Sequence, residues 1–79
     1  MTNKEKYDQV FVECFSVSPD VLNDEFVYQC VPEWDSVGHM AMIAALEDAF
    51  DIMMETEDII EFASYTVGMD KVRKYGVEL

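Results

Sequence analysis

The sequence predicts an all-α fold, a small four-helix bundle with three longer helices and a short third helix. Two observations lead to this prediction. In several segments the apolar side chains recur every three or four residues, which is the period of a helix. Residues that cap helices stand directly before those segments, and no segment alternates as a strand does. The chain has 79 residues, 51% of them hydrophobic, which suits one core, so we treat residues 1–79 as one domain.

The first helix is expected over residues 3–16, where five apolar side chains share one stripe. They are Tyr7, Val10, Phe11, Cys14 and Phe15. Ser18 and Pro19 then provide a cap and a proline suited to a first helical position, so a short helical turn is expected over residues 19–23. The rest of the connection has no regular period, and we expect its apolar residues to pack inward: Leu22, Phe26, Val27, Tyr28 and Val31.

Asp35 can cap the second helix, which is expected over residues 36–51. One side of this helix supplies a core stripe of Met42, Ala45, Leu46, Ala49 and Phe50, flanked by His39 and Ile43. The opposite side should be polar throughout, yet it begins with a hydroxyl, continues with apolar side chains and ends in carboxylates. We interpret it as a docking face for other proteins, formed by Val37, Met40, Ala44, Glu47, Asp48 and Asp51.

Thr56 is expected to cap a short third helix that runs through Glu61, with acidic residues placed favourably at the positive end of its dipole. The last helix is expected over residues 67–75, capped by Thr66 and ended by Gly76. Basic side chains near its C-terminal end complement the helix dipole: Lys71, Arg73 and Lys74.

Charge is the strongest signal of the composition, because 17 acidic residues stand against 5 basic ones and give a net charge of -12. The segment from Tyr7 to Asp70 holds fifteen Asp and Glu residues and neither Lys nor Arg. Such a surface repels nucleic acids and anionic membranes, and it attracts basic protein surfaces. We therefore expect no nucleic-acid partner and no membrane partner.

The sequence carries no signal for export or for a membrane anchor. It begins with polar residues, and its longest apolar run, residues 40–46, is too short to cross a bilayer. We therefore expect a cytoplasmic protein. Cys14 and Cys30 lack the clustered Cys and His residues of a zinc site, so both are expected to be free thiols, with Cys14 in the core.

Residues 33–40, Glu-Trp-Asp-Ser-Val-Gly-His-Met, place an Asp-Ser pair at the start of the second helix. This segment resembles the Asp-Ser-Leu signature of acyl carrier proteins, with Val37 in place of the usual Leu. An Asp-Ser pair alone is only a common helix cap. The resemblance continues through Ala-Leu-Glu-Asp-Ala-Phe-Asp at residues 45–51, then through the short acidic third helix to the start of the last one. It covers nearly the whole chain.

The resemblance implies that Ser36 is the attachment residue for 4'-phosphopantetheine, which a separate phosphopantetheinyl transferase takes from coenzyme A with the help of Mg²⁺. The carrier itself would not be an enzyme. By the same resemblance, Asp35 would not only cap the helix but also help to hold the metal ion of the transferase, and only this second role rests on the resemblance. The position suits the chemistry, because the first turn of a helix has free N–H groups that can stabilise an attached phosphodiester.

The resemblance also implies further partners: a ligase that loads acyl or aminoacyl groups, and a downstream transferase or synthase with a basic docking surface. We expect a monomer. Integrated peptidyl carriers usually show Gly-Gly before Asp-Ser, whereas Glu33 and Trp34 stand there in this chain. This difference favours a freestanding carrier of acyl or aminoacyl thioesters, and the cargo stays open.

Other classes of protein fit the sequence less well. Ser36, His39 and Asp35 could suggest a hydrolase, but neighbours on one exposed helix offer neither an orienting acid nor an oxyanion hole. A calcium loop would need acids at alternate positions around a central Gly, and no segment has them. An acidic helical protein–protein interaction module without a prosthetic group remains the alternative, although it would leave Ser36 without a role.

Overall fold

The computed structural model describes residues 2–79. These residues form four α-helices and one short 3-10 helix: α1 (Asn3–Phe15), η1 (Pro19–Val21), α2 (Ser36–Phe50), α3 (Thr56–Glu61) and α4 (Tyr65–Lys74). Within the same range there is no β-strand, only an isolated bridge between Val27 and Ser64. The predicted all-α fold is confirmed. None of the helices in the described part of the chain is long and apolar enough to cross a membrane.

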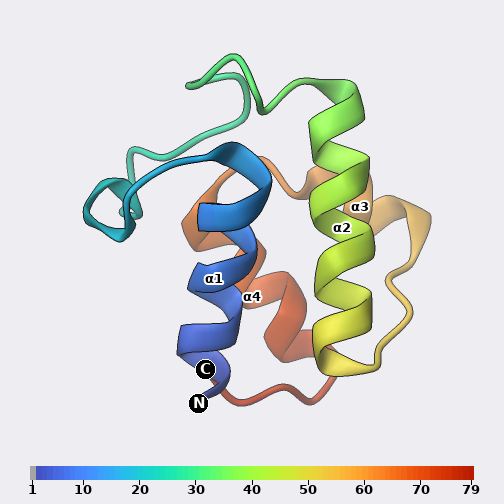
Figure 1. Cartoon of the computed structure of the whole chain (residues 1–79). Helices are drawn as coiled ribbons and strands as arrows, with labels where there is room; N and C mark the ends of the chain where they lie inside the picture. The colour runs from blue at the N-terminus through green and yellow to red at the C-terminus, as the bar shows by residue number, and fades with distance from the viewer. Residues whose placement is uncertain (1) are drawn as a thin grey trace.

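The helices pack as a small bundle (Figure 1). α1 and α2 lie side by side and run in opposite directions, α4 lies behind α1, and the short α3 lies behind the first half of α2. The connection between α1 and α2 covers the end of the bundle at which α2 begins. The beginning of α1 and the C-terminal residues lie at the other end in both ribbon views.

An aromatic cluster at the centre holds these parts together. Phe11 of α1 lies within 6.2 Å, centroid to centroid, of six other rings. They are Tyr7, Phe15, Phe26, Trp34, Phe62 and Tyr65. Trp34 is fully buried and stacks on Phe15 at 5.0 Å. Each such pair contributes about 0.5–1.5 kcal/mol beyond the burial of its area, so the connection before α2 is part of the core.

The core stripe of α2 is rotated from the predicted one toward α3. Met42 and Leu46 are buried as predicted, and Ile43, expected on the flank, is buried as well. Ala45, Ala49 and Phe50 are only partly buried. The reason is that the connection and α3 both pack on the His39 side of the helix, which a helical wheel of α2 alone does not reveal.

Two predictions about inward-facing side chains were wrong. Val27 and Tyr28 remain exposed, because this segment is extended and bonds to the α3–α4 connection: the Tyr28 N–H donates to the Ala63 carbonyl at 2.9 Å. Cys14 is only half-buried at the edge of the core, and burial still raises the pKa of its thiol. Both cysteines are free, as expected, and Cys30 is exposed.

The caps of α3 and α4 also differ from the prediction. The N-cap of α3 is Glu55, which makes no side-chain capping bond, and Thr56 is the first helical residue. α4 begins at Tyr65, where Ser64 caps it by accepting a hydrogen bond from the Val67 N–H at 3.0 Å. The bridge to Val27 keeps Ser64 extended, so the helix begins directly after the bridge rather than at residue 67.

Close packing explains why a glycine lies inside α4. A Cβ atom on Gly68 would lie 2.0 Å from Cζ of Phe62 and 2.4 Å from the Tyr7 hydroxyl. That hydroxyl donates a hydrogen bond to the Tyr65 carbonyl at 2.7 Å, and burial raises the pKa of Tyr7 far above its ordinary value. Only a residue without a side chain lets α4 approach α1 this closely.

Candidate functional site

Ser36 is the first residue of α2, and its side chain is exposed. Asp35 precedes it in extended conformation, and its Oδ1 accepts a hydrogen bond from the Gly38 N–H at 2.8 Å. The predicted capping role of Asp35 is therefore confirmed. The cap fixes where α2 begins, so the Ser36 hydroxyl is presented on the first turn, where backbone N–H groups are free of helical partners.

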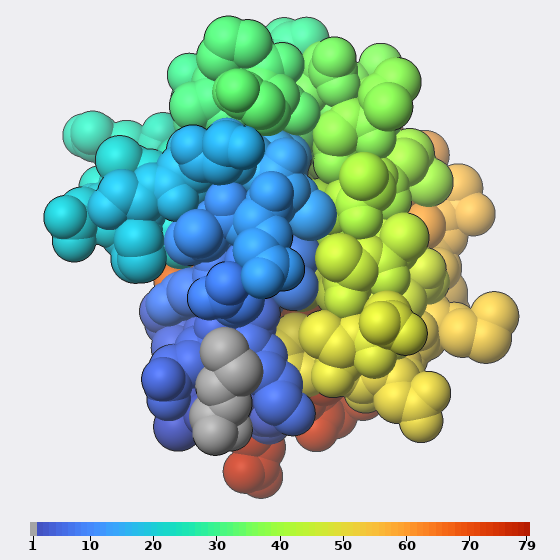
Figure 2. All heavy atoms as spheres, viewed as in Figure 1, coloured from blue at the N-terminus to red at the C-terminus, as the bar shows by residue number. Residues whose placement is uncertain are grey.

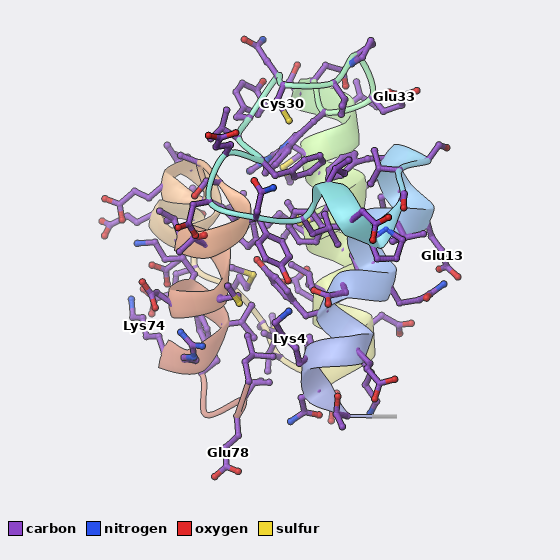
Figure 3. The ribbon with its side chains drawn as sticks, turned by 90° about the vertical axis from the view of Figure 1, so that its left-hand side faces the viewer. Lys4, Glu13, Cys30, Glu33, Lys74 and Glu78 are labelled. Atoms are coloured by element: carbon purple, nitrogen blue, oxygen red, sulfur yellow. The ribbon has the colours of Figure 1, made fainter. Side chains whose placement is uncertain are left out.

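Gly38 lets the chain before Ser36 fold tightly against this first turn. A Cβ atom at Gly38 would lie 1.9 Å from the Glu33 carbonyl oxygen, so any other residue would push the segment before Ser36 away. Glu33 and Cys30 lie at the end of the molecule at which α2 begins, and Glu78 lies at the opposite end (Figure 3).

His39 connects three parts of the chain. Its Nδ1 accepts a hydrogen bond from the Trp34 indole N–H at 2.9 Å, and its Nε2 lies 2.7 Å from the Ile59 carbonyl oxygen. The imidazole and indole planes differ by only 14°. His39 thus ties the segment before Ser36 and the end of α3 to α2. The sequence indicates no specific role for His39, because no sequence rule relates a Trp to a His five residues later across a helix cap.

An apolar cleft of about 350 Å³ lies between the first half of α2 and α3, directly beside Ser36. Its lining residues come from α2, from α3 and its C-terminal connection, and from the segment that precedes α2. They are Tyr28, Ser36, His39, Met40, Ile59, Ile60, Phe62 and Ala63. This cleft was not predicted from the sequence. The exposed apolar residue Ile60 on an otherwise acidic helix was the one signal that could have suggested it.

The apolar residues of the docking face lie on the same part of the surface as α3. Val37 is 78% exposed and Met40 is 54% exposed, and Ala44 is exposed one turn further along α2. Ile60, 74% exposed on α3, lines the same cleft as Met40. α2 forms a continuous ridge beside α1, and atoms of α3 emerge along its outer edge (Figure 2).

The three acidic residues of the docking face differ in their structural environment. Glu47 is half-buried, and its Oε2 accepts a hydrogen bond from the Met54 N–H at 2.9 Å, so it anchors the connection between α2 and α3. Asp48 lines a shallow groove on the α1 side together with Lys6. Asp51 is the C-cap of α2, with a φ of 53°. These three carboxylates therefore lie at the C-terminal end of α2, each with a different structural environment.

Two features of the structure are relevant to the hydrolase and metal-binding alternatives. Both ring nitrogens of His39 are bonded to Trp34 and Ile59, so neither is free to take a proton from Ser36 as a hydrolase would require. In residues 2–79, no three His, Cys, Asp or Glu side chains are grouped closely enough to hold a metal ion.

Comparisons with models of protein families, with curated proteins and with solved structures found no match to this chain.

Proposed function

We propose that this protein is a carrier: Ser36 receives a 4'-phosphopantetheine arm, and the thiol of that arm holds an acyl or aminoacyl group as a thioester for partner enzymes. The observation that carries the proposal is the exposed Ser36 hydroxyl at the capped start of α2, beside an apolar cleft. It stands in the segment of residues 33–40 that resembles the attachment signature of acyl carrier proteins.

The attachment reaction needs an accessible hydroxyl and a place for the phosphodiester that forms. The Ser36 oxygen would attack the phosphorus atom next to pantetheine in coenzyme A, the bond to the second phosphate would break, 3',5'-ADP would leave, and the serine proton would pass to a base of the transferase. The product carries one negative charge on the first turn of α2. There the free N–H groups and the positive end of the helix dipole favour an anion.

The cleft supports a role for the same site after loading. Its wall is mostly apolar, with polar atoms only on Tyr28, Ser36 and His39 among its lining side chains. An acyl chain folded back from the arm could therefore be shielded from water there. Burial of apolar surface contributes about 25 cal/mol per Å². A carrier that covers a reactive thioester in this way would protect it from hydrolysis between partner enzymes.

The surface around Ser36 fits partners with basic docking surfaces. Val37, Met40 and Ile60 expose apolar side chains that could be buried in a complex. The net charge of -12 on the whole chain would draw positively charged partners and speed the first encounter. The expected partners are a phosphopantetheinyl transferase, a loading ligase and a downstream transferase or synthase.

The test is direct modification of the purified protein. A broad-specificity phosphopantetheinyl transferase with coenzyme A and Mg²⁺ should add one arm to the wild type, seen by intact mass. Ser36→Ala should remain unmodified. Ser18→Ala is the matched control, because Ser18 is also an exposed serine at the start of a helical turn, and this variant should be modified like the wild type.

An unmodified wild type, under conditions that fully modify a known carrier protein, would contradict the proposal. In that case the acidic helical interaction module without a prosthetic group would become the better explanation of the charge. Modification of Ser36→Ala would show that the arm attaches to a different residue.

A further inference from the structure

The hydrogen bonds of His39 define its protonation state. The Trp34 indole nitrogen can only donate, so Nδ1 of His39 must carry no proton in order to accept. The Ile59 carbonyl oxygen can only accept, so Nε2 must carry the proton and donate. Both bonds exist together only in the neutral imidazole with its proton on Nε2.

Within residues 2–79, no ion pair would compensate a positive charge on His39. The imidazole pairs with the rings of Tyr28, Trp34 and Phe62 and bonds to the carbonyl of Ile59. Of these four groups, only the Tyr28 side chain is titratable. In residues 2–79, none of the salt bridges between carboxylates and basic groups includes His39. Asp35, the nearest carboxylate along the chain, is engaged in capping Gly38.

Protonation of Nδ1 would set two donors against each other. The new N–H would face the indole N–H of Trp34, which is buried and has His39 as its hydrogen-bond partner. A buried donor that loses its acceptor destabilises the arrangement that holds it. The bond from Nε2 to α3 would persist. Protonation would therefore weaken the contact between α2 and the segment that precedes Ser36.

We propose that His39 is a pH-sensitive latch of the cleft. In its neutral form it ties Trp34, and with it the segment before Ser36, to α2 and α3. When Nδ1 is protonated, the Trp34 bond is lost and the cleft wall formed by Tyr28 and His39 loosens beside Ser36. His39 is in this sense a positioning residue. The latch is a property of the fold, and only its consequence for loading and release of cargo rests on the proposed function.

The experiment uses the unmodified full chain and two spectroscopic signals. Trp34 is the only tryptophan, so its fluorescence reports on the residue that stacks on it. An imidazolium next to an indole quenches its emission. Imidazole nitrogen NMR distinguishes the two neutral tautomers directly. Both signals are followed from about pH 8 to about pH 5 at constant ionic strength, a range in which histidine titrates and most carboxylates do not.

At pH 8 we expect the neutral Nε2-protonated tautomer. As the pH falls, the nitrogen signals and the fluorescence should change together in one transition. Hydrogen exchange of the Trp34 indole N–H, corrected for its intrinsic pH dependence, should become about tenfold faster across that transition. His39→Gln is the matched variant, because its amide also offers an acceptor and a donor but does not titrate. It should show no transition.

Three results would overturn the latch. They are the Nδ1-protonated tautomer at pH 8, no histidine transition above pH 5, or an equal fluorescence change in wild type and His39→Gln. The wild-type NMR result is decisive even if the variant does not fold. The ratio of transferase rates for wild type and His39→Gln should in addition change between pH 8 and pH 6. Failure of both proteins to be modified would refute the proposed function and leave the latch standing on its spectroscopic result.

Discussion

Asp58 shows how a single charged residue can be buried in so acidic a chain. Its side chain is only 3% exposed, and it receives hydrogen bonds from the Tyr75 hydroxyl and from Lys74 Nζ at 3.0 Å. Lys71 Nζ lies 3.5 Å away. The bond from Tyr75 and then that from Lys74 hold the pKa of Asp58 below its usual value. Three groups, from α4 and its C-cap, thus converge on one carboxylate of α3.

We predict that Asp58→Asn lowers the melting temperature by several degrees at pH 7. The depressed pKa means that the folded state favours the ionised carboxylate. Its contribution is therefore complete above the unfolded pKa of about 3.9 and is lost as the pH falls through the lower folded pKa. The difference between wild type and variant should be largest near neutral pH and shrink below about pH 4, as measured by thermal melts across pH.

Asp70→Asn is the control for this prediction. Its carboxylate is 73% exposed and pairs with Arg73 three residues later, a surface ion pair of small effect. The melting temperature of this variant should stay close to that of the wild type. If both variants shifted it equally at pH 7, general charge reduction and not the Asp58 contacts would be responsible.

At the scale of the helices, the sequence predicted which elements form and the bounds of α1 and α2, but not where α4 begins. The stripe on residues 3–16 and the apolar side of residues 36–51 correspond to α1 and α2 within one residue at each end. α4 begins two residues before its predicted start at residue 67. The reason is the bridge between Val27 and Ser64, two residues 37 positions apart, which determines where this helix begins. Contacts this distant leave no local pattern in a sequence.

The candidate site, too, could be predicted only in part from the sequence. Ser36 and its cap Asp35 could be predicted, because capping depends on neighbouring residues. The cleft and the bonds of His39 could not, because they require α3 to lie against α2, and the sequence of either helix alone does not specify that contact. The hydrogen bond that Glu47 accepts from the Met54 N–H could not be predicted either, because it depends on the path of the connection after α2.

We predict that Met40→Lys slows modification by the transferase about tenfold, mainly through slower association. Met40 is exposed on α2 one turn after Ser36 and lines the cleft, so a lysine there would remove apolar contact and oppose a basic partner. The measurement is the initial rate of arm attachment, followed by mass at several concentrations of the protein.

Met53→Lys is the matched control for the docking prediction. It makes the same change at a methionine that is 86% exposed in the connection after α2, away from the beginning of that helix. Its modification rate should stay near that of the wild type. Equal slowing by both variants would mean that the overall charge acts on the transferase, and that Met40 belongs to no specific docking surface.

At the scale of the whole molecule, the dominant property is a charge of -12 on a body that measures 29 × 27 × 20 Å. The ion pairs reduce this charge only locally, since four of the five basic side chains already pair with neighbouring carboxylates. Exposed pairs each contribute about 0–1 kcal/mol. The remaining acids repel one another across the whole surface, and unfolding relieves that repulsion by separating them.

We therefore predict that the melting temperature rises with salt. At about 0.01 M salt the Debye length is about 30 Å, as long as the molecule itself, and at about 0.15 M it is about 8 Å, so that only close neighbours still interact. Screening weakens the ion pairs too, but the repulsion involves many more charges and dominates. In residues 2–79 no three ligating side chains are grouped for a metal ion, so MgCl₂ and NaCl should act alike at equal ionic strength. Thermal melts in both salts test this, and a melting temperature that stays flat or falls with salt would show that the acids are too dispersed to destabilise the fold.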